Sequence, residues 1–222
     1  MTLLGIDTST PASAACVLRA DGASFEVEPP PARLREGPGH ARELMPAIAS
    51  AMERAGLEFG ELEAIAVGVG PGTFTGLRIG IATARALASA GDLAVRPVSS
   101  LAALAEGIDA DARLALIDAR RGEVFGALYG AGGERLWPPF VAAPEQVAER
   151  VREAGVAARA AGDGSIRFRG VLEAAGIVVE SDQSRAHVVR ALHVCRLAQD
   201  VAGEPPEAVL PEYLRAPDAK PT

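Results

Sequence analysis

Two aspartates in this sequence stand where a protein could hold a metal-bound phosphate. Asp7 ends a short apolar run and is followed by Thr8 and Ser9. Asp118 ends a similar run in the middle of the chain. A carboxylate beside hydroxyl groups and backbone N–H donors can bind a metal–phosphate group. The same residues also suit an Asx turn, in which Asp7 accepts hydrogen bonds from amides two residues further on. The lack of a glycine that would let a phosphate approach favours the turn.

The loop 70–76, Gly-Pro-Gly-Thr-Phe-Thr-Gly, is a second candidate for anion binding. Backbone N–H groups at a helix N-terminus can hold an anion, and Gly72 and Thr73 would supply the contacts here. It is not a Walker loop, because the Lys-Ser/Thr pair is missing. A tight strand-to-helix turn, with Thr75 as the N-cap and Phe74 in the core, explains the same residues equally well.

Other chemistry-bearing residues form no catalytic pattern. The three histidines, His40, His187 and His193, lack the spacing of a zinc site, and no serine, Ser165 included, has a Gly-x-Ser-x-Gly setting. The charged turn 118–123 could bind a phosphate through its paired arginines, but charged turns are usually structural. We therefore expect no catalytic residue, no metal and no cofactor of this chain's own.

The composition bounds the class of protein. The chain has 222 residues, of which 49% are hydrophobic and 23% charged, and this excludes disorder. A net charge of -7 argues against a broad basic surface for nucleic acid. Cys16 and Cys195 are too few and too far apart for a disulfide framework, which indicates free thiols in a reducing compartment. The first residues read as a strand rather than a signal peptide, and no run is long enough to span a membrane, so we expect a cytoplasmic protein.

The elements that must position these residues are predicted to occur twice along the chain. In the first half the pattern predicts strands and helices at 3–7, 14–18, 24–28, 40–55 (helix), 64–69, 77–90 (helix), 94–98 and 99–107 (helix). In the second half it predicts them at 114–118, 123–129, 135–140, 144–154 (helix), 157–161, 169–175 (helix), 177–180 and 185–201 (helix).

Each half therefore has the order βββαβαβα, which predicts two tandem α/β domains with mixed sheets flanked by helices. We place them at residues 1–106 and 107–222, with a cleft between them in which Asp7 and Asp118 face each other. A duplicated β-hairpin unit with a strand-terminal Asp is the architecture of actin-like ATPases and sugar kinases. The proline-rich segment 203–222 should run back over the body, anchored by Tyr213 and Leu214.

The predicted helix 77–90 is built of small and apolar residues on nearly every side, with Gly80, Ala84 and Ala88 four residues apart. Such a helix is buried on more than one side, either inside its own domain or against a partner. We expect it to lie beside helix 41–55 on an outer face that binds a partner. The predicted interface comprises His40, Leu44, Ile48, Arg78, Ile81, Ala84 and Arg85.

Several motifs together resemble the TsaB (YeaZ) family of bacterial tRNA threonylcarbamoyladenosine biosynthesis proteins, over almost the whole chain. They are Gly5-Ile-Asp-Thr-Ser9, Gly70-Pro-Gly-Thr-Phe-Thr-Gly-Leu-Arg-Ile-Gly80, Pro97-Val-Ser-Ser-Leu101, Ile117-Asp-Ala-Arg-Arg-Gly-Glu-Val124 and Pro211-Glu-Tyr-Leu-Arg215. Small departures occur at Val69, Phe125 and Glu212. The resemblance implies an actin-like (ASKHA, ribonuclease H-like) fold.

The resemblance also implies a non-catalytic role. The paralogue TsaD carries paired metal-binding histidines on a helix, whereas the matching helix here keeps only His40. Family members pair with TsaD, and TsaE joins as the ATPase. The complex moves a threonylcarbamoyl group from threonylcarbamoyl-AMP to the adenosine beside the anticodon. The resemblance further implies a homodimer through the same helical surface and only indirect contact with tRNA.

A free-standing actin-like ATPase or small-molecule kinase, using Asp7 and Asp118, is the alternative function. The lack of a glycine-rich second phosphate loop and of an adenosine loop argues against it, since only Gly162-Asp-Gly164 could be a remnant. A peptidase, an old label of the family, has no supporting residues.

Overall fold

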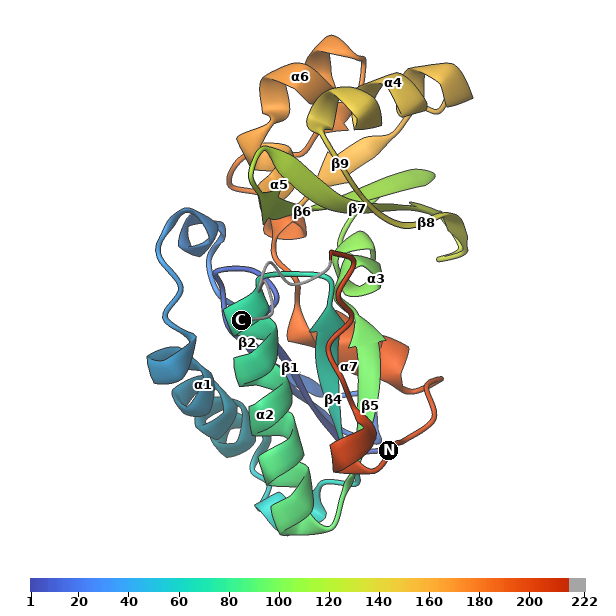
Figure 1. Ribbon diagram of the computed structural model, residues 1–222. Helices are drawn as coiled ribbons and strands as arrows, with labels where there is room; N and C mark the ends of the chain where they lie inside the picture. Colours follow the sequence, from blue (N-terminus) through green and yellow to red (C-terminus); the bar gives the residue numbers. More distant parts are fainter. Residues whose placement is uncertain (216–222) are drawn as a thin grey trace.

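The computed structural model describes residues 1–215 and shows two five-stranded mixed sheets, one from each half of the chain (Figure 1). The first half forms β1 (Leu3–Asp7), β2 (Ala14–Leu18), β3 (Ser24–Val27), η1 (Pro31–Arg35), α1 (His40–Ala55), η2 (Phe59–Glu61), β4 (Ala64–Gly70), α2 (Phe74–Gly91), β5 (Ala94–Ser99) and α3 (Ser100–Ala105). The second half forms β6 (Ala112–Arg120), β7 (Glu123–Gly130), β8 (Arg135–Ala142), α4 (Pro144–Ala154), β9 (Arg159–Ala161), α5 (Asp163–Arg167), α6 (Arg169–Ala174), β10 (Val178–Val179), η3 (Arg185–His187), α7 (Ala191–Ala198) and η4 (Pro206–Ala208).

The predicted α/β fold with its repeated βββαβαβα order is confirmed. The strand orders are β3-β2-β1-β4-β5 and β10-β9-β6-β7-β8, so β1 and β6 are the central strands. Each central strand pairs antiparallel with the next strand of its hairpin and parallel with the strand after the first helix. Asp7 and Asp118 therefore stand at equivalent places, near the carboxyl ends of the two central strands.

The last helix of each half packs on the other half's sheet. Figure 1 shows α7 beside the first sheet, on the face opposite α1 and α2, and far from α4 and α6. Cys195 of α7 and Leu3 of β1 belong to the same buried cluster as Leu104 of α3 and Ile117 of β6. The chain thus divides its strands between two sheets but shares this part of the core, and the boundary at residues 106 and 107 stays a prediction.

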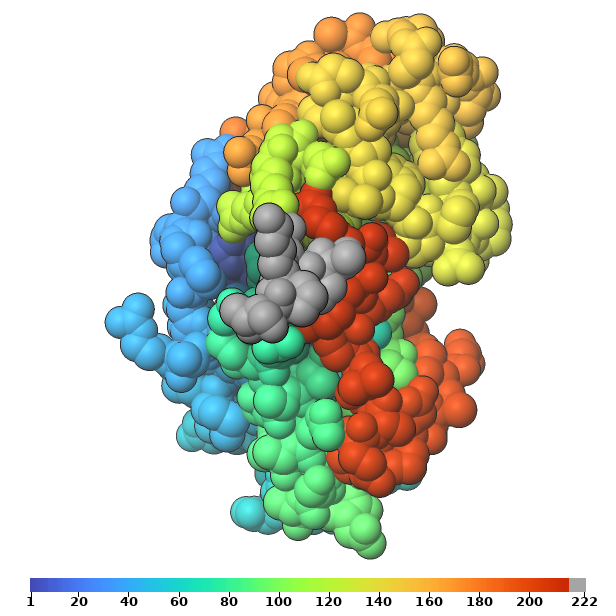
Figure 2. All heavy atoms as spheres, in the orientation of Figure 1, coloured from blue at the N-terminus to red at the C-terminus, as the bar shows by residue number. Residues whose placement is uncertain are grey.

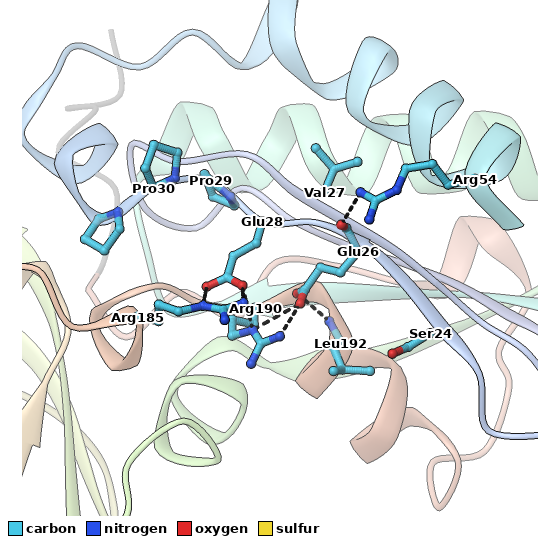
Figure 3. Close-up of a pocket in the computed structure, with 11 residues that line it drawn as sticks. Ser24, Glu26, Val27, Glu28, Pro29, Pro30, Arg54, Arg185, Arg190 and Leu192 are labelled. Atoms are coloured by element: carbon cyan, nitrogen blue, oxygen red, sulfur yellow. Dashed lines mark hydrogen bonds and ion pairs between the residues drawn. The ribbon is translucent and has the colours of Figure 1, made fainter.

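A cluster of ion pairs fixes α7 to the first sheet (Figure 3). The Glu26 carboxylate of β3, only 8% exposed, pairs with Arg190 and accepts a hydrogen bond of 3.0 Å from the Leu192 N–H in the first turn of α7. Glu28 pairs with Arg185 and, at 3.4 Å, with Arg190. These residues line an open cavity of about 740 Å³, and their charged groups are occupied by one another. We read the cluster as structural.

The C-terminal strap, residues 203–215, runs along the first half as predicted (Figure 2). Glu204 forms a β-bridge with Val95 at the edge of β5, and the Glu212 N–H donates to the Val69 carbonyl at 2.8 Å. The expected anchors are confirmed, since Tyr213 stacks on Phe74 and Leu214 packs against the shared core. Residues 216–222 of the predicted segment lie outside the described part of the chain.

Two local predictions were wrong. Helix α2 begins at Phe74 after Thr73, not after Thr75, because the Leu77 N–H already donates to the Thr73 carbonyl, and Phe74 is 46% exposed rather than buried in the core. The expected helix 185–201 is broken into η3, an extended stretch and α7. Tertiary contacts on both sides of the break, at buried His187 and at Arg190, outweigh the local helical pattern.

Ser99 caps α3, because its hydroxyl accepts the Ala102 N–H at the start of that helix. Within residues 1–215, the structure has no helix long and apolar enough to cross a membrane.

Candidate functional site

The turn that follows β1 is buried and satisfies its own polar groups. Asp7 and Ser9 are no more than 1% exposed. Asp7 Oδ1 accepts hydrogen bonds from the Ser9 N–H at 2.8 Å and the Ser9 hydroxyl at 2.7 Å, and Oδ2 accepts from the Ser100 hydroxyl at 2.8 Å. Burial raises the pKa of Asp7 above its ordinary value. The structure thus shows the Asx turn that the sequence favoured.

The glycine-rich loop lies directly on this turn. The Thr73 N–H donates to the Ser9 carbonyl at 2.7 Å, and the Thr8 hydroxyl donates to the Gly76 carbonyl at 2.7 Å. A Cβ on Gly72 would lie 2.4 Å from the Ser9 carbonyl oxygen, which explains why glycine is needed there. The two elements that could have held a phosphate are therefore in backbone contact and bond to each other.

Asp118 has an equally full set of partners in the second half. Its Oδ1 accepts the Arg120 N–H at 2.9 Å, and its Oδ2 lies 3.1 Å from Arg120 Nη1 and 2.8 Å from Arg167 Nη1. Arg120 and Arg121 adopt positive φ angles of 62° and 55° and form the turn to β7. The contacts of Asp118 and Arg120 favour the structural interpretation of this charged turn.

Two cavities lie between the halves. Asp118 lines both of them, whereas Asp7 lines neither. The larger, of about 640 Å³, lies between the loop 72–76, the turn 118–121 and the strap. The smaller, of about 320 Å³, lies between Pro11, η1 and α5. A cleft between the halves is therefore present, but Asp7 does not open onto either described cavity.

Asp163 borders the smaller cavity and was missed as a site residue by sequence reasoning. Its Oδ1 accepts the Asp118 N–H at 3.0 Å. Burial, and then the neighbouring Asp118 carboxylate, raise its pKa to about 6 against the effect of that hydrogen bond. The sequence offered Gly162-Asp-Gly164 only as a possible remnant of an ATPase loop, and nothing local in it reveals that the Asp163 carboxylate is buried.

Replacing Asp163 by Asn should stabilise the protein at neutral pH. The ordinary pKa of Asp is about 3.9, so the native state holds this proton more tightly and loses stability as the pH rises from about 4 to about 6. A shift of about two units corresponds to at most about 3 kcal/mol above that window. Asn keeps the acceptor for the Asp118 N–H. Urea unfolding should show a gain of about 1–3 kcal/mol at pH 7.5 that disappears near pH 4; an equal effect at both pH values would contradict this reading.

His40 was predicted to lie in the partner interface, but its side chain is only 3% exposed and is therefore not available at the surface. Its Nδ1 lies 2.9 Å from the Ser13 hydroxyl, and its Nε2 has no hydrogen-bond partner within the described structure. Burial lowers the pKa of His40 and favours the neutral ring. Elsewhere in residues 1–215, no group of three or more His, Cys, Asp or Glu side chains is placed to hold a metal ion.

The helices α1 and α2 lie side by side as expected, but several residues assigned to their outer face point inward. Leu44, Ile48, Ile81 and Ala84 are at most 5% exposed and pack in the core under the two helices. The sequence could not decide the orientation, because α2 is apolar or small on nearly all sides. Exposed residues of the two helices include Ala41, Met45 and Ala49 of α1 and Arg78, Ala82 and Ala86 of α2, of which only Arg78 was in the predicted interface. We call these six residues the α1–α2 surface; Arg85 is partly exposed beside it.

The paired sheets, the hairpin units and the strand-terminal aspartates define an actin-like α/β protein of two repeated units. Residues 37–219 match the model of the family described as "TsaD: tRNA N6-adenosine threonylcarbamoyltransferase". The chain belongs to this family of tRNA threonylcarbamoyladenosine biosynthesis proteins, and within it to the TsaB (YeaZ) group.

Individual relatives agree with this placement. The chain is 36% identical to TsaB of Escherichia coli over 164 residues, which cover 69% of this chain and 67% of that protein. It is 35% identical to Rv3421c of Mycobacterium tuberculosis over 220 residues, covering 99% and 94%. A crystal structure of a Pseudomonas aeruginosa protein, described as similar to the peptidase YeaZ, superposes with a TM-score of 0.80 at 31% identity, covering 96% of this chain and 99% of that one.

Proposed function

We propose that this chain is a non-catalytic subunit of a complex that makes N6-threonylcarbamoyladenosine in tRNA. In this proposal it binds a catalytic TsaD-type subunit in the cytoplasm, and a TsaE-type ATPase joins them. The complex transfers the threonylcarbamoyl group from threonylcarbamoyl-AMP to the adenosine beside the anticodon. The named relatives of the TsaB group support the pathway, and the site described above supports the non-catalytic role.

The single observation that carries this proposal is the closed state of the turn after β1. An actin-like ATPase needs that turn open to a metal–phosphate group. Here the Asp7 carboxylate is 1% exposed and accepts three hydrogen bonds from its own chain. A phosphate could enter only if the loop 72–76 moved away and broke the hydrogen bond to the Ser9 carbonyl.

The α1–α2 surface is the proposed docking site for TsaD and, in its absence, for a second copy of this chain. It presents Met45, 50% exposed, between Ala41 and Ala49 on α1, next to Ala82 and Ala86, which are four residues apart on α2. Small side chains let another pair of helices approach closely. Two such pairs would form a four-helix bundle that buries on the order of 1,600 Å², the usual size of a stable interface.

Co-purification tests the proposed partnership. A tagged copy of this chain is expected to retain the TsaD-type protein of its own organism, with no nucleotide required for the pair itself. Deleting the gene of this chain should remove threonylcarbamoyladenosine from tRNA, as measured by mass spectrometry of nucleosides. Normal amounts of the modified nucleoside in the deletion strain would refute the proposal.

Calorimetry with Mg-ATP separates the proposal from the ATPase alternative. We expect no binding at micromolar concentrations to the isolated chain, because the polar groups of the turn are already occupied. Micromolar binding that Asp7→Ala abolishes while the fold is kept would support the ATPase instead.

Asp118→Ala should leave transfer by the reconstituted complex within about tenfold of the unaltered rate. Removing a group that takes part in the chemistry typically costs 10²-fold or more. In this structure the Asp118 carboxylate binds Arg120 and Arg167 of its own chain. Radiolabelled threonine incorporation into tRNA measures the rate, and size-exclusion chromatography verifies assembly. A thousandfold loss in an assembled complex would refute the non-catalytic role.

A further inference from the structure

The larger cavity between the halves has an aromatic lining on which a flat ring of a ligand could stack. Phe74 and Tyr213 line it, with ring centroids 5.5 Å apart and planes inclined by 24°. Both rings are partly open to solvent, at 46% and 39% exposure. Phe125 and Leu214 add apolar surface to the lining. The volume of this cavity, about 640 Å³, lies within the range of pockets that bind small molecules.

The rim of the same cavity favours an anion. Arg120 lines it and shares the single Asp118 carboxylate with Arg167, so these three groups leave one positive charge in excess. At the Phe74 side, the described contacts of Arg78 are the Phe74 ring, 3.9 Å from its guanidinium carbon, and the Tyr213 hydroxyl at 3.2 Å. Arg78 thus adds a further positive charge.

The acidic groups at this rim do not cancel that excess. Arg215 pairs with Glu123 and also donates to the Ala119 carbonyl at 3.0 Å. Glu212 lines the cavity and offsets one positive charge, but Arg78, Arg120, Arg167 and Arg215 still outnumber Asp118, Glu123 and Glu212 by one. The cavity is therefore locally positive although the whole chain carries a net charge of -7.

We infer that this cavity binds one unstacked nucleotide of an RNA, with the base against Phe74 and Tyr213 and the phosphate toward Arg120. The inference rests on the proposed function, in which tRNA comes to the complex. It adds to that function a direct contact between this chain and the RNA. Stacking of bases on aromatic side chains beside arginines is the usual way proteins hold single-stranded nucleic acid. The acidic remainder of the chain limits the contact to this one place, so binding is weak and depends on salt.

The two tyrosines of the chain offer a direct test in the full protein. Labelled with 3-fluorotyrosine, they give one ¹⁹F signal from Tyr213 in the cavity and one from Tyr129, which is 6% exposed. The probe is an anticodon stem-loop RNA at low salt, whose loop contains unpaired nucleotides. We expect a saturable shift of the Tyr213 signal and none of the Tyr129 signal, which serves as an internal control.

Substitutions then test the stacking itself. Phe74→Leu keeps an apolar side chain but removes the ring, and should weaken binding of the stem-loop about 5- to 150-fold. Leu210→Ala is the matched control, because Leu210 is 67% exposed on the same strap and does not line the cavity. It should leave the dissociation constant within about twofold.

Three results would overturn the inference. One is a Tyr213 signal that the stem-loop does not move. Another is an equal shift with a blunt RNA duplex or with adenosine monophosphate at the same concentration, which would indicate phosphate binding or a free-nucleotide site. The third is unchanged binding by Phe74→Leu. Capture of the TsaD-type protein is measured without RNA, so an intact capture together with any of these results would reject this inference alone.

Discussion

Ala82→Glu on α2 is expected to abolish both homodimerisation and binding of the TsaD-type subunit while the monomer stays folded. Ala82 belongs to the α1–α2 surface and is exposed in the monomer, so a glutamate there costs little until a partner covers it. In a closely packed four-helix bundle the new side chain would clash and bury an unpaired charge, at a cost of several kcal/mol. Light scattering and pull-down should show at least a hundredfold weaker association, with unchanged circular dichroism.

Two control variants make this result specific. Ala154→Glu introduces the same charge at an exposed residue of α4 in the second half, and should leave both associations intact. Ala84 lies only two residues from Ala82 but is fully buried on the inner side of α2. Ala84→Glu should therefore unfold the chain rather than block a partner. If Ala82→Glu disrupted the homodimer yet bound the TsaD-type subunit at full strength, the prediction that both partners bind the same surface would be wrong.

Glu26→Ala is expected to give the largest loss of stability among single changes at the polar residues that join the two halves. It leaves Arg190 without its main partner and the Leu192 N–H without its acceptor at the start of α7. Removing one member of a buried ion pair typically costs 3–5 kcal/mol. Urea unfolding followed by circular dichroism measures the change, and hydrogen exchange should show the earliest loss of protection in α7.

The matched control is Glu36→Ala, because Glu36 also pairs with an arginine, Arg33, but its side chain is 64% exposed. Exposed ion pairs contribute less than about 1 kcal/mol, so this variant should unfold near the unaltered midpoint. A similarly small effect of Glu26→Ala would mean that α7 is held on the first sheet by apolar packing alone.

The repeated strand pattern could be predicted from the sequence because each half encodes it locally. Apolar runs ending in Asp7 and Asp118, followed by turn residues, give the central hairpins directly. The Asx turn at Asp7 was also predictable, since its partner Ser9 is two residues away. Such features depend on neighbours in the chain, and local propensity is enough to determine them.

Features that depend on distant contacts were missed. The inward orientation of Ile81 and Ala84 follows from how α2 meets the first sheet, and a helix that is small or apolar on all sides carries no signal for it. The break before α7 follows from Arg190 reaching Glu26, which is 164 residues away. The buried carboxylate of Asp163 depends on how α5 packs on β6. None of these contacts is visible in a local window of the sequence.

Reconstituted transfer tests the central claim that this chain acts by association and not by chemistry. The purified chain, TsaD-type and TsaE-type subunits of one organism are combined with ATP, threonylcarbamoyl-AMP and tRNA, and the modified nucleoside is quantified while this chain is titrated. The account predicts no product from this chain alone, product that saturates as it fills the TsaD-type subunit, and a loss with Ala82→Glu that matches the loss of association. Product from the chain alone, or full activity of Ala82→Glu where no complex is detected, would contradict it.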